Sequence, residues 1–286
     1  MTKSSKQRRQ SSPHTPTENA TNSQEKVAVI AGGGDLPMRI CSKLDELHRD
    51  YVCVSIAGFG PQEHQQFNIG EIGQILRFIK EAQAKSILFC GHVKRPSFFS
   101  LKLDSVGKKW LASLGIKSFL GDDALLRGIK KLILREGFQV ISPHSIMNTL
   151  LTPRGVLTNH RPTDLDLQDI ARGIFVLNTL AKTDVGQAVI VQEGVILGIE
   201  AAEGTSRLVN RCKDLKLNEQ GGVLVKTAKT GQDTSMDLPT VGPQTIIQAA
   251  ECSLSGIALG SDNSQIIDYD ETISLANAKG IFVIGI

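Results

Sequence analysis

Aromatic residues are scarce in this sequence, at 5% of 286 residues, and the charges of the two signs nearly cancel, with 32 Lys and Arg against 29 Asp and Glu. A nucleic-acid-binding protein needs a basic face, and recognition of single strands also needs aromatic side chains on which bases can stack. The composition supplies neither, so we expect no nucleic-acid partner. Hydrophobic residues make up 41% of the chain, which is ordinary for a folded globular protein.

Long apolar segments are missing as well. No uncharged apolar run approaches the roughly 18 residues that a membrane-spanning helix requires, and the N-terminus lacks the apolar core of a secretory signal. Residues 1–25 are rich in Ser, Thr, Gln and Asn, a composition that predicts a disordered tail. A transit peptide is the alternative for this basic, hydroxyl-rich segment. We therefore expect a soluble cytoplasmic protein.

The five cysteines are scattered and form no C-x-x-C pair. Cys53 and Cys90 lie inside apolar runs. We expect all five to be reduced core residues in a reducing compartment, and we expect neither a disulfide framework nor a zinc site.

Several catalytic motifs are also absent from the sequence, namely G-x-S-x-G, H-E-x-x-H and G-x-x-x-x-G-K-[ST]. Their absence argues against a serine hydrolase, a zincin metalloprotease and a P-loop NTPase.

The first half of the chain alternates between strand-like and helix-like segments. Apolar runs at 26–31, 51–57, 86–91 and 138–142 predict strands, and helical patterns lead to Glu46, cover 71–83 and cover 122–136. Such alternation predicts an α/β fold with a parallel sheet and helices on both of its faces.

The second half has a different pattern. Residues 152–164, which include two prolines and a glycine, mark a domain boundary. After a helix near 166–181, two β-type runs flank Glu193-Gly194, which indicates a hairpin whose second strand has Val195, Leu197 and Ile199 on one face. Further strands near 221–228, Ile266 and Ile281, with a helix from Pro243, predict a mixed α/β domain. The predicted organisation is a tail (1–25), an N-terminal domain (26–155), a linker (156–165) and a C-terminal domain (166–286).

The first candidate site is the glycine run after the first strand. A turn at Gly32, Gly33 and Gly34, followed by Asp35, lets backbone N–H groups and a helix N-terminus approach a phosphate closely. A dinucleotide fingerprint would require a third glycine where Pro37 stands, and an acid about 20 positions further on. The loop is therefore phosphate-compatible and NAD is disfavoured; a tight turn without a ligand is the alternative.

The second candidate is the loop from Gly91 to Pro96, which contains Lys94 and Arg95. It follows the third strand, and ligands of open α/β sheets bind outside the carboxyl ends of the strands. Arg is well suited to hold a phosphate group. His92 is a weaker candidate, because it has no visible partner, and a solvated surface loop is the alternative reading.

Acidic residues supply the remaining candidates. Asp122 and Asp123 are suited to hold Mg²⁺, although helix capping is the favoured explanation for them. Two further stretches, 200–205 and 226–242, combine acids, lysines and glycines. Phosphoryl chemistry uses acids to hold a metal and lysines to neutralise phosphate oxygens. Charged turns at strand ends are the alternative.

Taken in order, these segments resemble one family, the LpxI-type UDP-2,3-diacylglucosamine pyrophosphatases of lipid A biosynthesis. The resemblance covers nearly everything from Val27 to Ile286, and the matching stretches are IAGGGDLP, GHVKRP, GDDALLRGI, DVGQAVIV, IEAAEGT, LVKTAKTGQD and MDLPTVGPQT.

This resemblance implies a Rossmann-like N-terminal domain, a separate C-terminal α/β domain and a substrate held between them. The implied reaction is hydrolysis of the UDP-sugar pyrophosphate by water attack on the α-phosphorus, with Mg²⁺ required and Mn²⁺ left open. Asp237 takes the position of the family's essential aspartate, as a metal ligand or as the group that activates water. Glu203, Asp122 and Asp123 are the other candidate metal ligands. The candidate substrate-binding residues are Gly33, Gly34, Asp35, Gly91, Lys94, Arg95, Gln187, Gly204, Thr205, Lys226 and Lys229.

The implied partners are the diacylated UDP-sugar and, peripherally, the surface of the inner membrane; a homodimer is compatible with the sequence. The chain departs from the family pattern at Ser206, where an acid is usual, and at Ser235, where an arginine is usual. Two alternatives stay open: a UDP-sugar-binding protein without catalytic activity, and a dinucleotide-dependent oxidoreductase, against which Pro37 counts.

Overall fold

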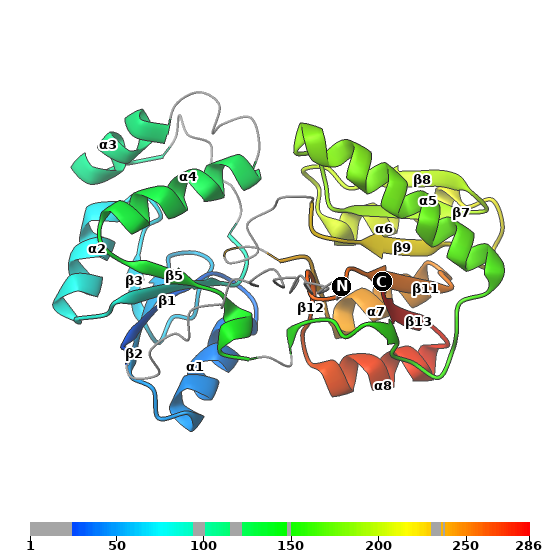
Figure 1. Cartoon of the computed structure of the whole chain (residues 1–286), viewed down its shortest axis with the longest axis horizontal. Coiled ribbons are helices and arrows are strands. Elements are labelled where there is room, and N and C mark those ends of the chain that lie inside the picture. The colour runs from blue at the N-terminus through cyan, green and yellow to red at the C-terminus, as the bar shows by residue number, and fades with distance from the viewer. Residues whose placement is uncertain (1–24, 94–100, 115–121, 148–149, 230–235, 237) are drawn as a thin grey trace, which may run out of the picture.

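The computed structural model describes residues 25–93, 101–114, 122–147, 150–229, 236 and 238–286. Two α/β domains lie next to each other, the N-terminal one built on a five-stranded sheet and the C-terminal one on a six-stranded sheet (Figure 1). The predicted fold class is therefore confirmed.

The N-terminal sheet is parallel throughout and has the strand order expected of a Rossmann-like domain. Its strands, in spatial order, are β3 (Gln65–Phe67), β2 (Tyr51–Ile56), β1 (Val27–Ala31), β4 (Ser86–Cys90) and β5 (Gln139–Ile141). β1 is buried at every residue, as an apolar central strand covered on both faces must be. The direction of chain crossover reverses between β1 and β4, the position at which such sheets bind ligands.

Helices cover both faces of this sheet. α1 (Leu36–Glu46) packs on one face, where Ile40 and Leu44 are fully buried. α2 (Ile72–Glu81), α3 (Ser105–Leu114) and α4 (Asp122–Arg135) contribute side chains to the core on the other face. Burial of a side chain the size of Ile40 or Leu44 contributes roughly 1.5–3 kcal/mol, so each core anchors its helices on the sheet.

The C-terminal sheet is mixed, as predicted. Its strands, in spatial order, are β6 (Gly155–Val156), β13 (Phe282–Gly285), β11 (Gly256–Leu259), β9 (Val223–Lys226), β7 (Ala188–Gln192) and β8 (Val195–Ile199). β9, β11 and β13 are parallel to one another, and β6, β7 and β8 are each antiparallel to a neighbour. A separate pair of parallel strands, β10 (Thr240–Val241) and β12 (Gln265–Ile266), stands apart from this sheet.

α5 (Asp164–Leu180) covers one face of the C-terminal sheet. α6 (Thr205–Cys212), α7 (Pro243–Glu251) and α8 (Tyr269–Lys279) pack on the opposite face. Short 3₁₀ helices cover Pro143–Ser145, Ala181–Thr183 and Lys213–Leu215. α5 begins two residues before the predicted position because Thr163 and Asp166 form a capping box. In this capping box the Thr163 and Asp166 backbone N–H groups each donate a hydrogen bond to the side chain of the other residue. These bonds satisfy N–H groups that have no partner within the helix.

The predicted hairpin is present, but one prediction about it is wrong. Glu193 and Gly194 both have positive φ, 52° and 77°, as a two-residue hairpin turn requires. The register shifts between Ile190 and Val191, and this irregularity places Leu197 in the core under α6–α8 while Ile199 packs toward α5. These two side chains therefore do not share a face, because an extra residue in one strand reverses the alternation of side chains.

The chain also enters the second domain earlier than the boundary we predicted. Gly155 and Val156, assigned to the end of the first domain and to the linker, form β6 and pair with β13. The two domains touch through an ion pair between Arg39 of α1 and Asp268, and through Ile267, which packs against the core of the first domain. Periodicity could not predict so short a strand, because its pairing partner lies at the far end of the sequence.

Candidate functional site

A cavity of about 320 Å³ lies where the carboxyl ends of β1 and β4 face the C-terminal domain. This volume is within the usual range for small-molecule sites. Its position is the switch point of the N-terminal sheet, and both domains line it. The lining residues are Gly33, Gly34, Asp35, Leu36, Phe89, Cys90, Gly91, His92, Pro143, Met236, Leu238, Thr240, Gln265 and Ile267.

The two loops predicted from the first domain are joined in one structure. The Gly32 N–H donates to the carbonyl of Cys90 at 2.8 Å, and Gly33 and His92 exchange backbone hydrogen bonds of 2.8 and 2.9 Å. A Cβ atom on Gly33 would lie 2.8 Å from Cε1 of His92 and 3.1 Å from the carbonyl oxygen of Phe59. A Cβ atom on Gly32 would lie 2.7 Å from the backbone carbonyl oxygen of His92, so the close packing of the two loops requires glycine at position 32.

The N-terminus of α1 opens toward the same cavity. Asp35 is the N-cap residue, but its side chain makes no capping hydrogen bond, and Pro37 occupies the first turn. The first N–H groups of a helix have no partner within the helix, and the helix dipole favours negative charge at this end. Together with the glycine turn, this end of α1 is suited to receive a phosphate group.

The strands β10 and β12 supply the facing wall. The Thr240 hydroxyl donates to the carbonyl of Leu238 at 2.9 Å and accepts from Nε2 of Gln265 at 2.7 Å. Gln265 is buried, and its Oε1 has no hydrogen-bond partner among the described residues. Asp237 lies outside the described residues, while its neighbours Met236 and Leu238 both line the cavity.

Behind this wall, three side chains of the C-terminal domain, those of Lys226, Thr205 and Glu200, form a network of hydrogen bonds. The Lys226 ammonium donates to Oγ1 of Thr205 at 2.9 Å and to the carbonyl of Thr240 at 3.0 Å. The Thr205 hydroxyl donates to Oε1 of Glu200 at 2.7 Å, and Oε2 of Glu200 accepts from the Gln187 N–H at 3.2 Å. Glu200 and Lys226 are each only 7% exposed. The structure thus brings the predicted residues Gln187, Thr205 and Lys226 together.

Glu200 is the member of this network that sequence reasoning did not select. Its burial depends on Thr205 and on Lys226, which comes from a different strand, so its neighbours in the sequence carry no signal. Gln265 was missed for the same reason, and Thr240 was included only as part of the stretch 226–242, because the place of both residues in the cavity follows from the pairing of β10 with β12.

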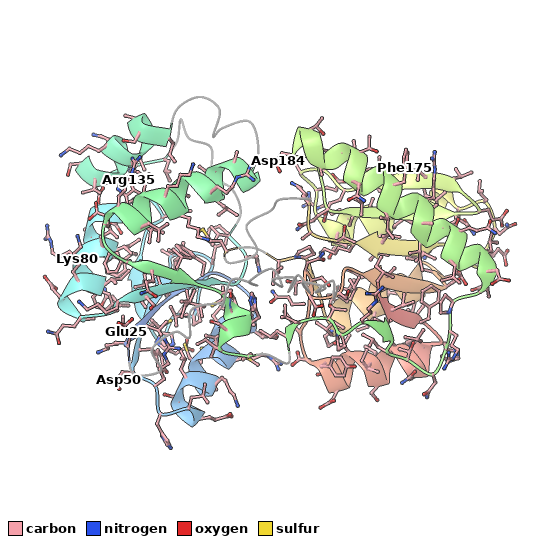
Figure 2. The ribbon with its side chains drawn as sticks, in the orientation of Figure 1. Glu25, Asp50, Lys80, Arg135, Phe175 and Asp184 are labelled. Atoms are coloured by element: carbon pink, nitrogen blue, oxygen red, sulfur yellow. The ribbon has the colours of Figure 1, made fainter. Side chains whose placement is uncertain are left out.

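Lys229, a predicted substrate-binding residue, is held by Asp184. Its ammonium forms an ion pair with the Asp184 carboxylate and also donates to the Asp184 carbonyl at 3.2 Å. Figure 2 shows Asp184 on the side of the C-terminal domain toward the N-terminal domain. Lys229 is therefore a positioned cation with a carboxylate partner.

Glu203, a candidate metal ligand, is engaged by Arg211. Its Oε1 accepts from Nη2 and Nε of Arg211 at 2.9 and 3.1 Å, and its Oε2 accepts from the Ala201 N–H at 3.1 Å. Its own backbone N–H, followed by the Arg211 side chain and the Ala201 N–H, lowers the pKa of Glu203. Gly204, with a φ of 80°, follows it and is the N-cap residue of α6.

The other candidate residues lie partly or wholly outside the described part of the chain. Lys94 and Arg95 lie outside the described residues. Asp122 is the first residue of α4, where the predicted helix begins, but the side chains of Asp122 and Asp123 are not described. In the part of the chain that is described, the acids near the cavity do not gather into a group of three metal ligands. None of the described helices has the length and apolar character needed to cross a bilayer.

Fold and cavity together define the class: an α/β protein of two domains, the first Rossmann-like, with a cavity between a glycine turn and a polar wall. Models of two domains match the chain, the LpxI N-terminal domain over residues 26–150 and the LpxI C-terminal domain over residues 153–284. The chain belongs to the LpxI family.

A curated relative from Caulobacter vibrioides, named UDP-2,3-diacylglucosamine pyrophosphatase LpxI, is 34% identical over 272 residues, which is 91% of this chain and 97% of the relative. Among solved structures, the N5-carboxyaminoimidazole synthase from Aspergillus clavatus in complex with ADP and an aminoimidazole ribonucleotide is 11% identical. The match covers 68% of this chain and 45% of that one at a TM-score of 0.23, which is too weak a likeness to support an argument.

Proposed function

We propose that this chain hydrolyses the pyrophosphate of UDP-2,3-diacylglucosamine to UMP and 2,3-diacylglucosamine 1-phosphate in lipid A biosynthesis. Membership of the LpxI family supports the proposal. So does the relative from Caulobacter vibrioides, which is named for this activity and is matched over nearly its whole length. The observation that carries it furthest is the cavity, which joins a phosphate-compatible turn to residues that flank Asp237.

The substrate's pyrophosphate is placed at the N-terminus of α1. There the turn at Gly33 and Gly34 allows close approach of a phosphate, and the first N–H groups of a helix have no partner within the helix. Gly91 keeps the second loop close, since a Cβ on it would lie 2.7 Å from the Gly33 carbonyl oxygen. In this proposal Lys94 and Arg95 add positive charge for the phosphate oxygens.

Asp237 is the proposed catalytic residue, and water is proposed to attack the α-phosphorus. The surroundings of Asp237 support this role, because the residues before and after it line the cavity. In addition Thr240, the first residue of β10, accepts hydrogen bonds from Gln265 and Lys226. Lys226 is thereby a positioning residue for this segment as well as a candidate cation for the substrate.

The residues fit a Mg²⁺ ion that is shared with the substrate. Mg²⁺ is usually held by one or two carboxylates, with phosphate oxygens and water completing its shell, and the exposed carboxylate of Asp35 lines the cavity without a capping bond. Asp237 would hold the ion, with Asp122 and Asp123 as further candidates; Glu203 would first have to leave Arg211. When bound, Mg²⁺ would neutralise charge on the pyrophosphate, and Mn²⁺ suits the same ligands.

Release of UMP from UDP-2,3-diacylglucosamine tests the proposal. We expect release by the intact chain with Mg²⁺, loss of release with EDTA, and a loss of at least a hundredfold in Asp237→Ala. Asp214→Ala, an acid in the 3₁₀ helix after α6, is the matched control and should retain activity. The same chain should bind neither NAD nor NADP, and binding of either would favour the oxidoreductase alternative.

Substrate binding by the folded chain without any UMP release would overturn the proposal and favour the binding protein. In that case Ser206 and Ser235, where an acid and an arginine are usual in the family, are the first positions to revert. The substrate also carries two acyl chains, so we propose peripheral contact with the inner membrane from the cytoplasmic side. Flotation with lipid vesicles checks that contact, and sedimentation equilibrium checks for a homodimer.

A further inference from the structure

Three potential metal ligands converge beside the N-terminal sheet, and none of them lines the cavity described above. Cys41 lies on α1, Cys53 lies on β2, and His64 stands just before β3. One ligand atom from each side chain, two sulfurs and one ring nitrogen, lies within 4.8 Å of the other two. Both cysteines are buried free thiols.

The His64 ring supports a ligand at this point. Its Nε2 atom is buried and has no hydrogen-bond partner among the described residues. A buried polar atom without a partner costs about 1–3 kcal/mol, so its burial beside two thiols requires an explanation. Coordination of a metal ion would satisfy it.

We propose that Cys41, Cys53 and His64 form a binding site for Zn²⁺. Sulfur and imidazole ligands favour Zn²⁺ over Mg²⁺ or Ca²⁺, which prefer oxygen. Ligands in a tetrahedral zinc site are roughly 3.5–3.8 Å apart, as Zn–S and Zn–N bonds of about 2.3 and 2.0 Å require. From the present spacing, within 4.8 Å, the three atoms have to approach one another by up to about 1 Å to reach these distances. The two thiols lose their protons on binding, so their thiolates balance the charge of the ion, and water takes the fourth position.

A zinc ion at this site would hold together the segments that support the glycine turn of the cavity. It connects α1, whose N-terminus faces the cavity, to β2 and to the segment that follows β2. That segment contains Phe59, whose carbonyl oxygen limits the space at Gly33. A zinc ion held by three separate segments would therefore fix the glycine turn without touching the substrate. This role is independent of the Mg²⁺ proposed for hydrolysis.

The test uses the full chain, reduced and stripped of metal with a chelator. Titration calorimetry with Zn²⁺ should show one tight equivalent per chain. Co²⁺ in place of Zn²⁺ should produce a sulfur-to-cobalt charge-transfer band, which reports thiolate ligation directly. Cys41→Ser and Cys53→Ser should each weaken Zn²⁺ binding at least a hundredfold, and each should reduce the band.

His64→Gln is the most informative variant, because His64 is partly exposed on a loop and its replacement leaves the core intact. It should weaken Zn²⁺ binding at least tenfold and remove the rise in melting temperature that Zn²⁺ causes in the parent chain. Cys212→Ser, which alters a buried thiol of the C-terminal domain, is the matched control and should bind Zn²⁺ like the parent.

Three results would overturn the proposal. They are the absence of a stoichiometric equivalent in the parent chain, a cobalt spectrum without the thiolate band, and Zn²⁺ binding that persists at full strength in folded His64→Gln and Cys53→Ser. A direct Cys41–Cys53 disulfide that persists in the presence of reductant, detected by mass spectrometry, would count equally against it. None of these readouts depends on hydrolysis, so they separate this site from the proposed function.

Discussion

Replacing Lys226 by Met should destabilise the C-terminal domain, because the ammonium satisfies two buried acceptors at once. Lys226 donates to Thr205 and to the carbonyl of Thr240, and it is 7% exposed. Methionine has a similar volume but donates no hydrogen bond, so both acceptors would be left buried without this donor. Each such loss costs about 1–3 kcal/mol, so the two together cost roughly 2–6 kcal/mol.

Urea unfolding of the intact chain, followed by far-UV circular dichroism, measures this loss. The matched second variant is Thr205→Val, which removes one of the two acceptors, and the double variant completes a thermodynamic cycle. Because Lys226→Met and Thr205→Val break the same hydrogen bond, the double variant should lose less than the sum of the single losses, by roughly 0.5–3 kcal/mol.

Two outcomes would refute the reasoning. One is a loss below about 0.5 kcal/mol in Lys226→Met, the level of an ordinary surface substitution. The other is strict additivity in the cycle, which would show that Lys226 and Thr205 do not depend on each other in solution. Substrate affinity is measured separately, so that a loss of binding in the folded variant can be assigned to the substrate role of Lys226.

Three further variants test other parts of the structure. Asp169→Ala should cost about 3–6 kcal/mol, since hydrogen bonds to a charged group are worth about 1.5–3 kcal/mol each. The buried Asp169 carboxylate accepts two of them, from the N–H groups of Glu193 and Gly194 at 3.0 and 2.6 Å. Chemical unfolding that differs little from that of the parent would contradict this prediction. Gly33→Ala should weaken the binding of UMP at least tenfold, as measured by calorimetry. It should also cost about 1–3 kcal/mol in stability, since the new Cβ meets both His92 and the Phe59 carbonyl. Unchanged affinity for UMP would show that the turn does not hold the phosphate. Arg211→Met should raise the pKa of Glu203, which Arg211 helps to lower. A carboxyl group with a lowered pKa stabilises the folded state at pH values above its ordinary pKa, and this stabilisation is lost as the pH falls through the lowered value. The stability of the variant should therefore fall less steeply in acid than that of the parent. An equally steep fall in stability would count against the pairing of Arg211 with Glu203.

The long strands and helices were predictable because local sequence determines them. β1, β2, β4, β7 and β9 are apolar runs, as strands covered on both faces must be, and their predicted positions agree with the structure to within two or three residues at each end. β3, β6 and β10 have two or three residues each, and they were not predicted. Their existence depends on pairing with strands of other segments, and no window of sequence contains that information. The register shift at Ile190 is equally non-local.

The site was predictable to the extent that its residues follow strands. The turns after β1 and β4 had to meet, because parallel strands end at the same edge of the sheet and these two are neighbours. Glu200 and Gln265 could not be found in this way, since a charge or an amide looks the same in the sequence whether it is solvated or buried. Their burial comes from Thr205, Lys226 and Thr240, residues of other segments.

The two walls of the cavity use different chemistry, and this difference has a consequence for function. The N-terminal wall presents mainly backbone groups, at the glycine turn and at the N-terminus of α1, and such groups suit a phosphate whatever is attached to it. The C-terminal wall presents side chains, among them Thr240 and the half-satisfied amide of Gln265. Buried polar groups of that kind discriminate between ligands, because a ligand that fails to pair with them leaves them unsatisfied. We therefore propose that the first domain anchors the pyrophosphate of the substrate and that the second domain discriminates among nucleotide sugars.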